Sequence, residues 1–76
     1  MKITIKLFAT LRQGRFKIGE FEYPEGITVG QVLDKLVISR KEMEIGIVFI
    51  NGKHADFNTI INAGDIVAIF PPVAGG

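Results

Sequence analysis

The residues with the clearest chemical potential lie at the end of the chain, in the stretch "AIFPPVAGG". Glycine has no Cβ, so the backbone at Gly75 and Gly76 can pass through a channel in which any side chain would clash. An α-carboxylate on Gly76 has a pKa of roughly 3.5 and is ionised at neutral pH. The stretch therefore predicts a carboxylate on a thin lead, suited to the narrow active site of another enzyme, with Gly76 as the reacting residue.

The residues before Gly76 fit this interpretation. Proline fixes φ at about −65°, so the proline pair stiffens the exit from the last strand and projects the chain away from the body. The next two residues are small enough to lie in a groove. We expect a threading segment made of Pro71, Pro72, Val73, Ala74 and Gly75. The alternative is an ordinary terminus, because small residues often collect at chain ends.

Reactive side chains are sparse in the rest of the chain. It has no cysteine, which excludes disulfides, thiolate metal sites and a cysteine nucleophile. It has a single histidine and no evident pair of carboxylates. His54 follows the Asn51-Gly52 pair, which favours an exposed position on a hairpin. The pattern predicts neither a metal site nor a catalytic side chain.

Composition restricts the classes of partner. The 76 residues carry a formal net charge of +1, which offers no strong field for nucleic acid or an acidic membrane surface. We expect no bilayer-spanning stretch and no signal peptide, and the lack of cysteine fits a cytoplasmic protein. The early cations favour a solvated strand face and loop over a basic edge for an acidic partner. They are Lys2, Lys6, Arg12, Arg15 and Lys17.

Periodicity predicts an α+β domain over residues 1–70 with a flexible tail over 71–76. Alternating apolar residues predict a strand at 2–8, paired in an antiparallel hairpin with a strand at 16–23. The pattern of the second strand slips, which suggests a bulge at Gly19. Further strands are expected at 47–50, 53–57 and 65–70, with Asn51-Gly52 as the turn between the first two of these. Ile60 and Ile61 are expected to fill the core.

One helix is expected over residues 28–38. Thr28 and Gln31 have the spacing of a capping box, in which each side chain bonds the other residue's backbone N–H. The residues after them form an apolar stripe at helical spacing. Its members are Val29, Val32, Leu33, Leu36 and Val37. Residues 39–46 are expected to be a polar connector.

The strands at 47–50 and 65–70 are apolar on both faces, yet a single helix covers only one face of a sheet. Either the loops cover the second face, or it is an exposed patch that binds another protein. For Ile47 to Ile50 loop cover is a sufficient explanation. For Phe8 and Phe70 we favour partner binding, because Phe70 borders the tail.

The chain resembles the β-grasp, ubiquitin-like sulfur carriers, whose branches are the molybdopterin synthase small subunit (MoaD) and the thiazole-forming carrier (ThiS). "VAIFPPVAGG", "KLFATLR" and "NAGDIVAIF" are similar to the molybdopterin branch, and the match is weakest over residues 39–46. The fold that the resemblance implies is a mixed sheet of about five strands crossed by one main helix. The resemblance also implies a partner contact near His54, where the molybdopterin branch often has an apolar residue and this chain has a polar one. His54 therefore joins Phe8 and Phe70 as an expected partner-binding residue.

The resemblance further implies a mechanism. An adenylating enzyme of the ubiquitin-activating type would use ATP and Mg²⁺ to activate Gly76, and a sulfur donor would convert it to a thiocarboxylate. The large subunit of molybdopterin synthase would then accept the sulfur for molybdenum or tungsten cofactor biosynthesis. The chain itself would be a co-substrate without a bound cofactor. The alternatives are a thiazole (thiamine) carrier and a ubiquitin-like interaction module or modifier.

Overall fold

The computed structural model describes residues 1–72, and the predicted tail residues Val73, Ala74, Gly75 and Gly76 lie outside the described residues. Its strands are β1 (Lys2–Leu7), β2 (Ile18–Glu22), β3 (Ile47–Ile50), β4 (Lys53–Ala55) and β5 (Ile66–Phe70). The helix α1 covers Val29–Lys35, and two 3₁₀ helices, η1 and η2, cover Ala9–Arg12 and Glu42–Ile45. The predicted α+β class is confirmed.

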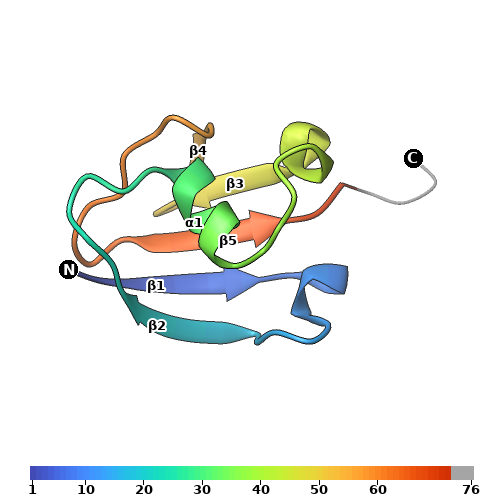
Figure 1. Ribbon diagram of the computed structural model, residues 1–76, viewed down its shortest axis with the longest axis horizontal. Helices are drawn as coiled ribbons and strands as arrows, with labels where there is room; N and C mark the ends of the chain where they lie inside the picture. Colours follow the sequence, from blue (N-terminus) through green and yellow to red (C-terminus); the bar gives the residue numbers. More distant parts are fainter. Residues whose placement is uncertain (73–76) are drawn as a thin grey trace.

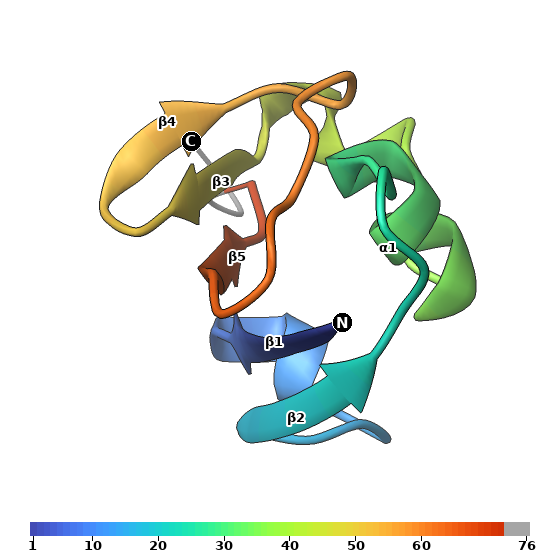
Figure 2. The ribbon, with the colours of Figure 1, turned by 90° about the vertical axis from the view of Figure 1, so that its left-hand side faces the viewer.

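The five strands form one mixed sheet in the order β2-β1-β5-β3-β4. The first and last strands pair in parallel, from Thr4 opposite Ile66 to Leu7 opposite Ile69, and the other pairings are antiparallel. Figure 2 shows α1 on one side of this sheet, and no other part of residues 1–72 covers the opposite side. We call the uncovered side the open face. The arrangement is the β-grasp fold.

The core lies between the sheet and α1, and every residue in it is apolar within the described part of the chain. Strand β1 contributes Ile3, Ile5 and Leu7, all at most 1% exposed, as the alternation predicts. Of the two isoleucines predicted to fill the core, Ile61 is buried but Ile60 is exposed. Neighbouring residues of an extended segment face opposite sides, so with Ile61 in the core the Ile60 side chain faces outward. The prediction for Ile60 was wrong.

The predicted bulge at Gly19 is absent, because the register of β1 with β2 runs without interruption from Lys2–Glu22 to Lys6–Ile18. The apparent slip arises because Phe16 lies before the strand and packs on Phe21, with ring centroids 5.1 Å apart. A Cβ on Gly19 would come within 2.9 Å of the Phe21 ring and 3.3 Å of the Phe16 ring. Glycine is required here by the space that the two rings occupy.

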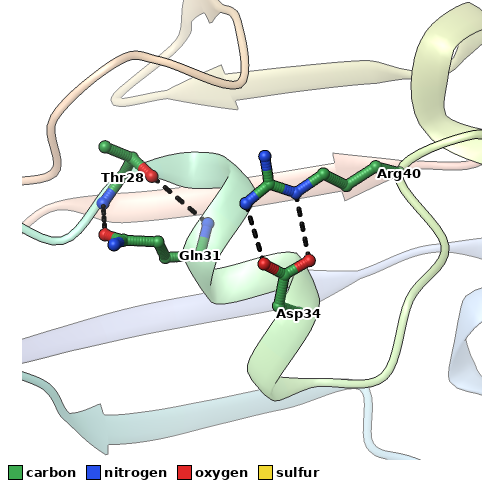
Figure 3. Close-up of polar contacts among 4 residues, drawn as sticks. All are labelled: Thr28, Gln31, Asp34 and Arg40. Atoms are coloured by element: carbon green, nitrogen blue, oxygen red, sulfur yellow. Dashed lines mark hydrogen bonds and ion pairs between the residues drawn. The ribbon is translucent and has the colours of Figure 1, made fainter.

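Helix α1 begins as predicted. The Gln31 amide donates to Thr28 Oγ1 over 3.2 Å, and the Thr28 amide donates to Gln31 Oε1 over 2.9 Å (Figure 3). The amides of Val29 and Gly30 donate to the carbonyls of Thr59 and Phe57, so the 56–65 loop ties the helix start to the rest of the domain. These bonds satisfy amides that a helix leaves unpaired at its first turn.

A second contact on α1 was not predicted from the sequence. Arg40 donates two hydrogen bonds to the Asp34 carboxylate, at 3.0 and 2.8 Å (Figure 3). Hydrogen bonding to this guanidinium lowers the pKa of Asp34 from its ordinary value. The pair stabilises the fold above the ordinary carboxyl pKa, and that contribution disappears as the pH falls through the lowered pKa. Both side chains are exposed, so the contribution is small.

The helix ends earlier than predicted, at Lys35 with Leu36 as its C-terminal cap. The amide of Val37 donates to the Asp34 carbonyl and that of Ile38 to the Leu33 carbonyl, which is the Schellman arrangement. Val37 has φ of 58° and an 83% exposed side chain, so its predicted place in the apolar stripe was wrong. Ile38 is buried instead, because the left-handed residue turns the chain back toward the core.

This helix end yields a stability prediction. A β-branched residue with positive φ is strained, whereas asparagine tolerates the left-handed region. Val37→Asn is expected to raise the free energy of unfolding by about 0.5–1 kcal/mol, which is a rise of about 2–8 °C in Tm for a domain of this size. Thermal unfolding followed by circular dichroism measures the change. Val37→Thr is the control, since it is polar but still β-branched, and an equal rise for both variants would contradict the explanation from backbone strain.

The connector over residues 39–46 is less polar in its packing than expected. Met43, in η2, is 3% exposed and packs in the core. The turn at Asn51-Gly52 is as predicted, with φ of 51° and 81° at its two residues. None of the helices in the part of the chain described here has the length and apolarity needed to cross a bilayer.

Candidate functional site

The chain leaves the domain after β5, at a point between η1 and η2. Figure 1 shows the blue turn after β1 and the yellow-green turn before β3 at the same end of the molecule as this exit, opposite the N-terminus. Pro71 and Pro72 are half-buried there. One shallow hollow between the two turns is lined by Thr10, Leu11, Lys41 to Met43, Ile45 and the two prolines.

A second hollow, of about 590 Å³, opens on the open face of the sheet at the same end. Its lining is almost entirely apolar. We call its main residues the tail-root cluster: Phe8, Ile47, Phe49, Phe70, Pro71 and Pro72. The two prolines therefore border hollows on both sides, and the first predicted residues of the threading segment are continuous with an apolar surface.

Three aromatic rings organise the tail-root cluster. Phe8 and Phe70 stack with centroids 4.1 Å apart and planes 13° apart. Phe49 meets Phe70 edge-on, at 5.9 Å and 86°. Such pairs contribute about 0.5–1.5 kcal/mol beyond the area they bury. The rings are mutually supported but half-buried, so they form a preorganised surface.

Strand pairing explains why these rings meet. Phe8 follows the last residue of β1, and its amide donates to the Ile69 carbonyl in the parallel neighbour β5 over 3.2 Å. Ile47 pairs with Phe70 across β3 and β5. Arg12, the last residue of η1, holds that turn in place. Its Nε donates to the Leu7 carbonyl over 2.7 Å, and its guanidinium carbon lies 5.3 Å from the Phe8 ring centroid.

The sequence left open whether loops cover the second face, and the loops within the described residues 1–72 do not. Ile47 is 44% exposed, and Phe49 beside it is half-buried. The 56–65 loop instead reaches the helix side, where the Ile61 amide donates to the Ile27 carbonyl. Loop cover was thus the wrong explanation for Ile47 and Phe49, which belong to the same surface as Phe8 and Phe70.

His54 lies at the margin of this surface. It pairs with Phe49 across β3 and β4 and meets that ring edge-on at 6.1 Å and 88°. Its exposed position on a hairpin is as predicted. Phe49, which sequence reasoning did not select, thus links His54 to the stacked pair of Phe8 and Phe70. Their role in partner binding stays a prediction, as does the reactive role of Gly76.

The described polar side chains offer no set of metal ligands near the tail-root cluster. Among residues 1–72, no three His, Asp or Glu side chains gather closely enough to hold a metal ion. Of the early cations, Arg15 serves the fold, since its guanidinium donates to the carbonyls of Leu36 and Val37 at 3.2 and 2.9 Å. Lys2 lies 4.0 Å from Glu20 on an exposed strand face.

Comparison with known proteins identifies relatives over the full length of the chain. The model of the ThiS family matches residues 5–76. No curated protein matches the chain. SAMP1 from Haloferax volcanii is 31% identical, with a TM-score of 0.75 and complete coverage of both chains.

Two further solved structures have the same fold. A molybdopterin converting factor subunit 1 from Pyrococcus furiosus is 25% identical, with a TM-score of 0.72 and coverage of 96% of this chain and 99% of that one. A chain from the complex of subunits 1 and 2 of the molybdopterin-converting factor of Helicobacter pylori is 18% identical, with a TM-score of 0.65 and complete coverage of both chains. At that identity the second likeness shows the fold alone.

Proposed function

We propose that this chain, which belongs to the ThiS family, is a sulfur carrier that docks through the tail-root cluster and is loaded at the carboxylate of Gly76. The observation that carries the proposal is the uncovered aromatic surface of Phe8, Phe49 and Phe70, which runs directly into Pro71. Solvent-exposed apolar surfaces of this kind mark protein-binding sites. The family match extends through Gly76, which supports a role for the terminal residues.

The loading chemistry takes place in the partner. The Gly76 carboxylate attacks the α-phosphate of ATP, and pyrophosphate leaves, with Mg²⁺ at the partner neutralising phosphate charge. A persulfide sulfur of the donor then attacks the acyl carbon, and AMP leaves with the bonding electrons. A thiol breaks the sulfur–sulfur bond of the acyl persulfide, which yields the thiocarboxylate and a disulfide. These steps need no side chain of the carrier, which acts as a co-substrate.

For the acceptor we propose a pterin precursor held by a large synthase subunit. The thiocarboxylate sulfur attacks an electrophilic carbon of the precursor and displaces an oxygen leaving group, which departs with its bonding electrons. Water then hydrolyses the resulting thioester, which leaves the sulfur on the precursor as a thiol and returns the Gly76 carboxylate. The similarity to the Pyrococcus furiosus subunit 1 supports this branch, as does the tail "FPPVAGG". The protein would act in the cytoplasm, where thiols are kept reduced.

Intact-mass measurement tests the proposal. The full chain is incubated with an enzyme that activates ThiS or MoaD carriers, together with ATP, Mg²⁺, a persulfide donor and a thiol. We expect one oxygen atom of Gly76 to be replaced by sulfur, as located by fragmentation of the intact chain. An unchanged mass with every activating enzyme tried, under conditions that load a known carrier, would contradict the proposal.

A second candidate is a ubiquitin-like modifier, which forms an amide between Gly76 and a lysine of another protein. The similarity to SAMP1, whose full name is small archaeal modifier protein 1, favours it. Capture of conjugates under denaturing conditions, followed by identification of the branched peptide, distinguishes the two candidates. A thiazole carrier would share the loading chemistry, and rescue of a thiamine requirement rather than of molybdoenzyme activity would identify it.

Docking through the tail-root cluster yields a prediction for Phe70→Ala. Removing this ring leaves Phe8 and Phe49 without their common partner, and we expect affinity for the activating enzyme to fall about tenfold to thirtyfold. Titration calorimetry measures the affinity. Ile66→Ala is the matched control, because Ile66 lies on the same strand and face but at the other end, and it is also exposed. Equal losses for the two variants would contradict docking at the cluster.

A further inference from the structure

Gly46 joins η2 to β3 directly beside the exit of the chain from β5. Its φ of −85° and ψ of −179° are extended backbone that any residue adopts. Its amide donates to the Met43 carbonyl over 3.1 Å, which closes η2. The backbone conformation therefore gives no reason for a glycine at this position.

The reason is space. A Cβ on Gly46 would lie 2.8 Å from the carbonyl oxygen of Phe70, 2.6 Å from Met43 Cε and 2.9 Å from Met43 Sδ. Met43 is buried, so a displaced side chain would disturb the core packing around it. Phe70 is held by its pairing with Ile47 and its stacking on Phe8. Any side chain at position 46 must therefore displace the Phe70 carbonyl, Met43 or both.

The Phe70 carbonyl has a special place in the chain, because it belongs to the peptide group that joins Phe70 to Pro71. That group is planar, and φ of proline is fixed. The residue before a proline is itself restricted to extended conformations. The orientation of this one carbonyl thus sets the direction in which Pro71 and Pro72 leave the sheet.

We infer that Gly46 is a positioning residue, which sets the exit direction of the tail by admitting the Phe70 carbonyl to close contact. The inference rests on the proposed function. A carrier docked through the tail-root cluster must present Gly76 to a reaction centre at a fixed distance and direction from that cluster. A Cβ at position 46 points toward Met43 and the core side, so it changes the exit direction without adding to the open face.

Steady-state adenylation kinetics test the inference. With the activating enzyme and the full chain, Gly46→Ala is expected to lower kcat for pyrophosphate release about tenfold to a hundredfold, because misplacement of a reacting group by about 1 Å has effects of this size. KM for the carrier should change far less than kcat, since the three rings of the tail-root cluster keep their mutual contacts and only its two prolines are redirected. A fall in affinity with unchanged kcat would overturn the inference, as would wild-type kinetics.

Gly30→Ala is the matched control. Its Cβ would also meet atoms at 2.7–2.9 Å, but these belong to the end of the Arg40 side chain, far from the tail root. Arg40 can move away, so this variant is expected to keep kcat and KM of the parent. An equal fall in kcat for both alanine variants would show a general structural effect and would overturn the inference.

Two further measurements test the inference, and the first of them needs no kinetics. The ¹³C chemical shift of the Phe70 carbonyl is expected to move in Gly46→Ala and to stay in Gly30→Ala, and this needs no partner enzyme. An unmoved chemical shift would overturn the inference. Failure of the parent chain to be adenylated would contradict only the proposed function. If Gly46→Ala fails to fold, one glycine inserted between Phe70 and Pro71 frees the exit direction with Gly46 intact, and an unchanged kcat would then overturn the inference.

Discussion

Gly76→Ala is expected to lower the rate of thiocarboxylate formation roughly a hundredfold and to leave the melting temperature unchanged. A methyl group on the reacting residue would meet the walls of a site shaped for bare backbone, so the carboxylate would stop short of its attack position. Displacements of about 1 Å in such geometries have effects of this size. Single-turnover conversion, followed by intact mass, measures the rate.

The effect should fall on the rate rather than on docking, because the tail-root cluster is unchanged in this variant. Gly26→Ala is a suitable control. A Cβ at Gly26 would meet nothing within 4 Å, and its φ of 86° makes the substitution strained but remote from the tail. We expect it to lower stability by about 1–2 kcal/mol without changing the rate of conversion. Comparable rates for Gly76→Ala and the parent would contradict the threading mechanism.

Leu33→Ala is expected to lower the free energy of unfolding by about 2–5 kcal/mol. Leu33 is fully buried between α1 and the sheet, and its carbonyl also accepts the Ile38 amide at the helix end. A small domain has only about 5–15 kcal/mol of stability, so a substantial fraction of the variant can be unfolded at physiological temperature. Urea unfolding followed by far-UV circular dichroism measures the loss.

Leu36→Ala is the matched control for that loss. Leu36 caps the same helix but is only half-buried, so its truncation removes less buried surface and leaves a smaller cavity. We expect a loss well below that of Leu33→Ala. If the two variants lose equal stability, the assignment of Leu33 to the centre of the core is wrong.

The two ends of α1 show which features of this fold can be predicted from the sequence and which cannot. The start was predictable because Thr28 and Gln31 satisfy each other's amides within one turn, which is a local arrangement. The end was not, because Arg15 holds it from 21 and 22 residues away, through the Leu36 and Val37 carbonyls. A left-handed valine cannot be read from helical periodicity.

Gly19 and Gly46 show the same limit for glycine. The sequence suggests a bulge at Gly19. Neither Gly19 nor Gly46, however, has a backbone conformation that only glycine can adopt. Each leaves room for atoms brought beside it by the fold: two rings at Gly19, and Met43 with the Phe70 carbonyl at Gly46. Such contacts depend on tertiary packing, which a single sequence does not display.

The tail-root cluster was predictable only in part. Phe8 lies out of phase with the buried face of β1, and Phe70 precedes the prolines, so both could be selected from pattern alone. Phe49 joins them only through the register of β3, in which Ile47 opposes Phe70. The choice between loop cover and exposure for that strand depended on where the 56–65 loop runs, and it runs to the helix side.

The parallel pairing of β1 with β5 has a consequence for folding during synthesis on the ribosome. The first strand made by the ribosome receives its central neighbour only when Ile66–Phe70 has emerged, so the sheet cannot close before these residues leave the ribosome. Pairings this distant in sequence make folding slow, and unpaired strand edges promote aggregation. Because Phe70 is the ring that joins Phe8 and Phe49, a nascent or truncated chain that lacks β5 would have an incomplete tail-root cluster with which to bind a partner unproductively.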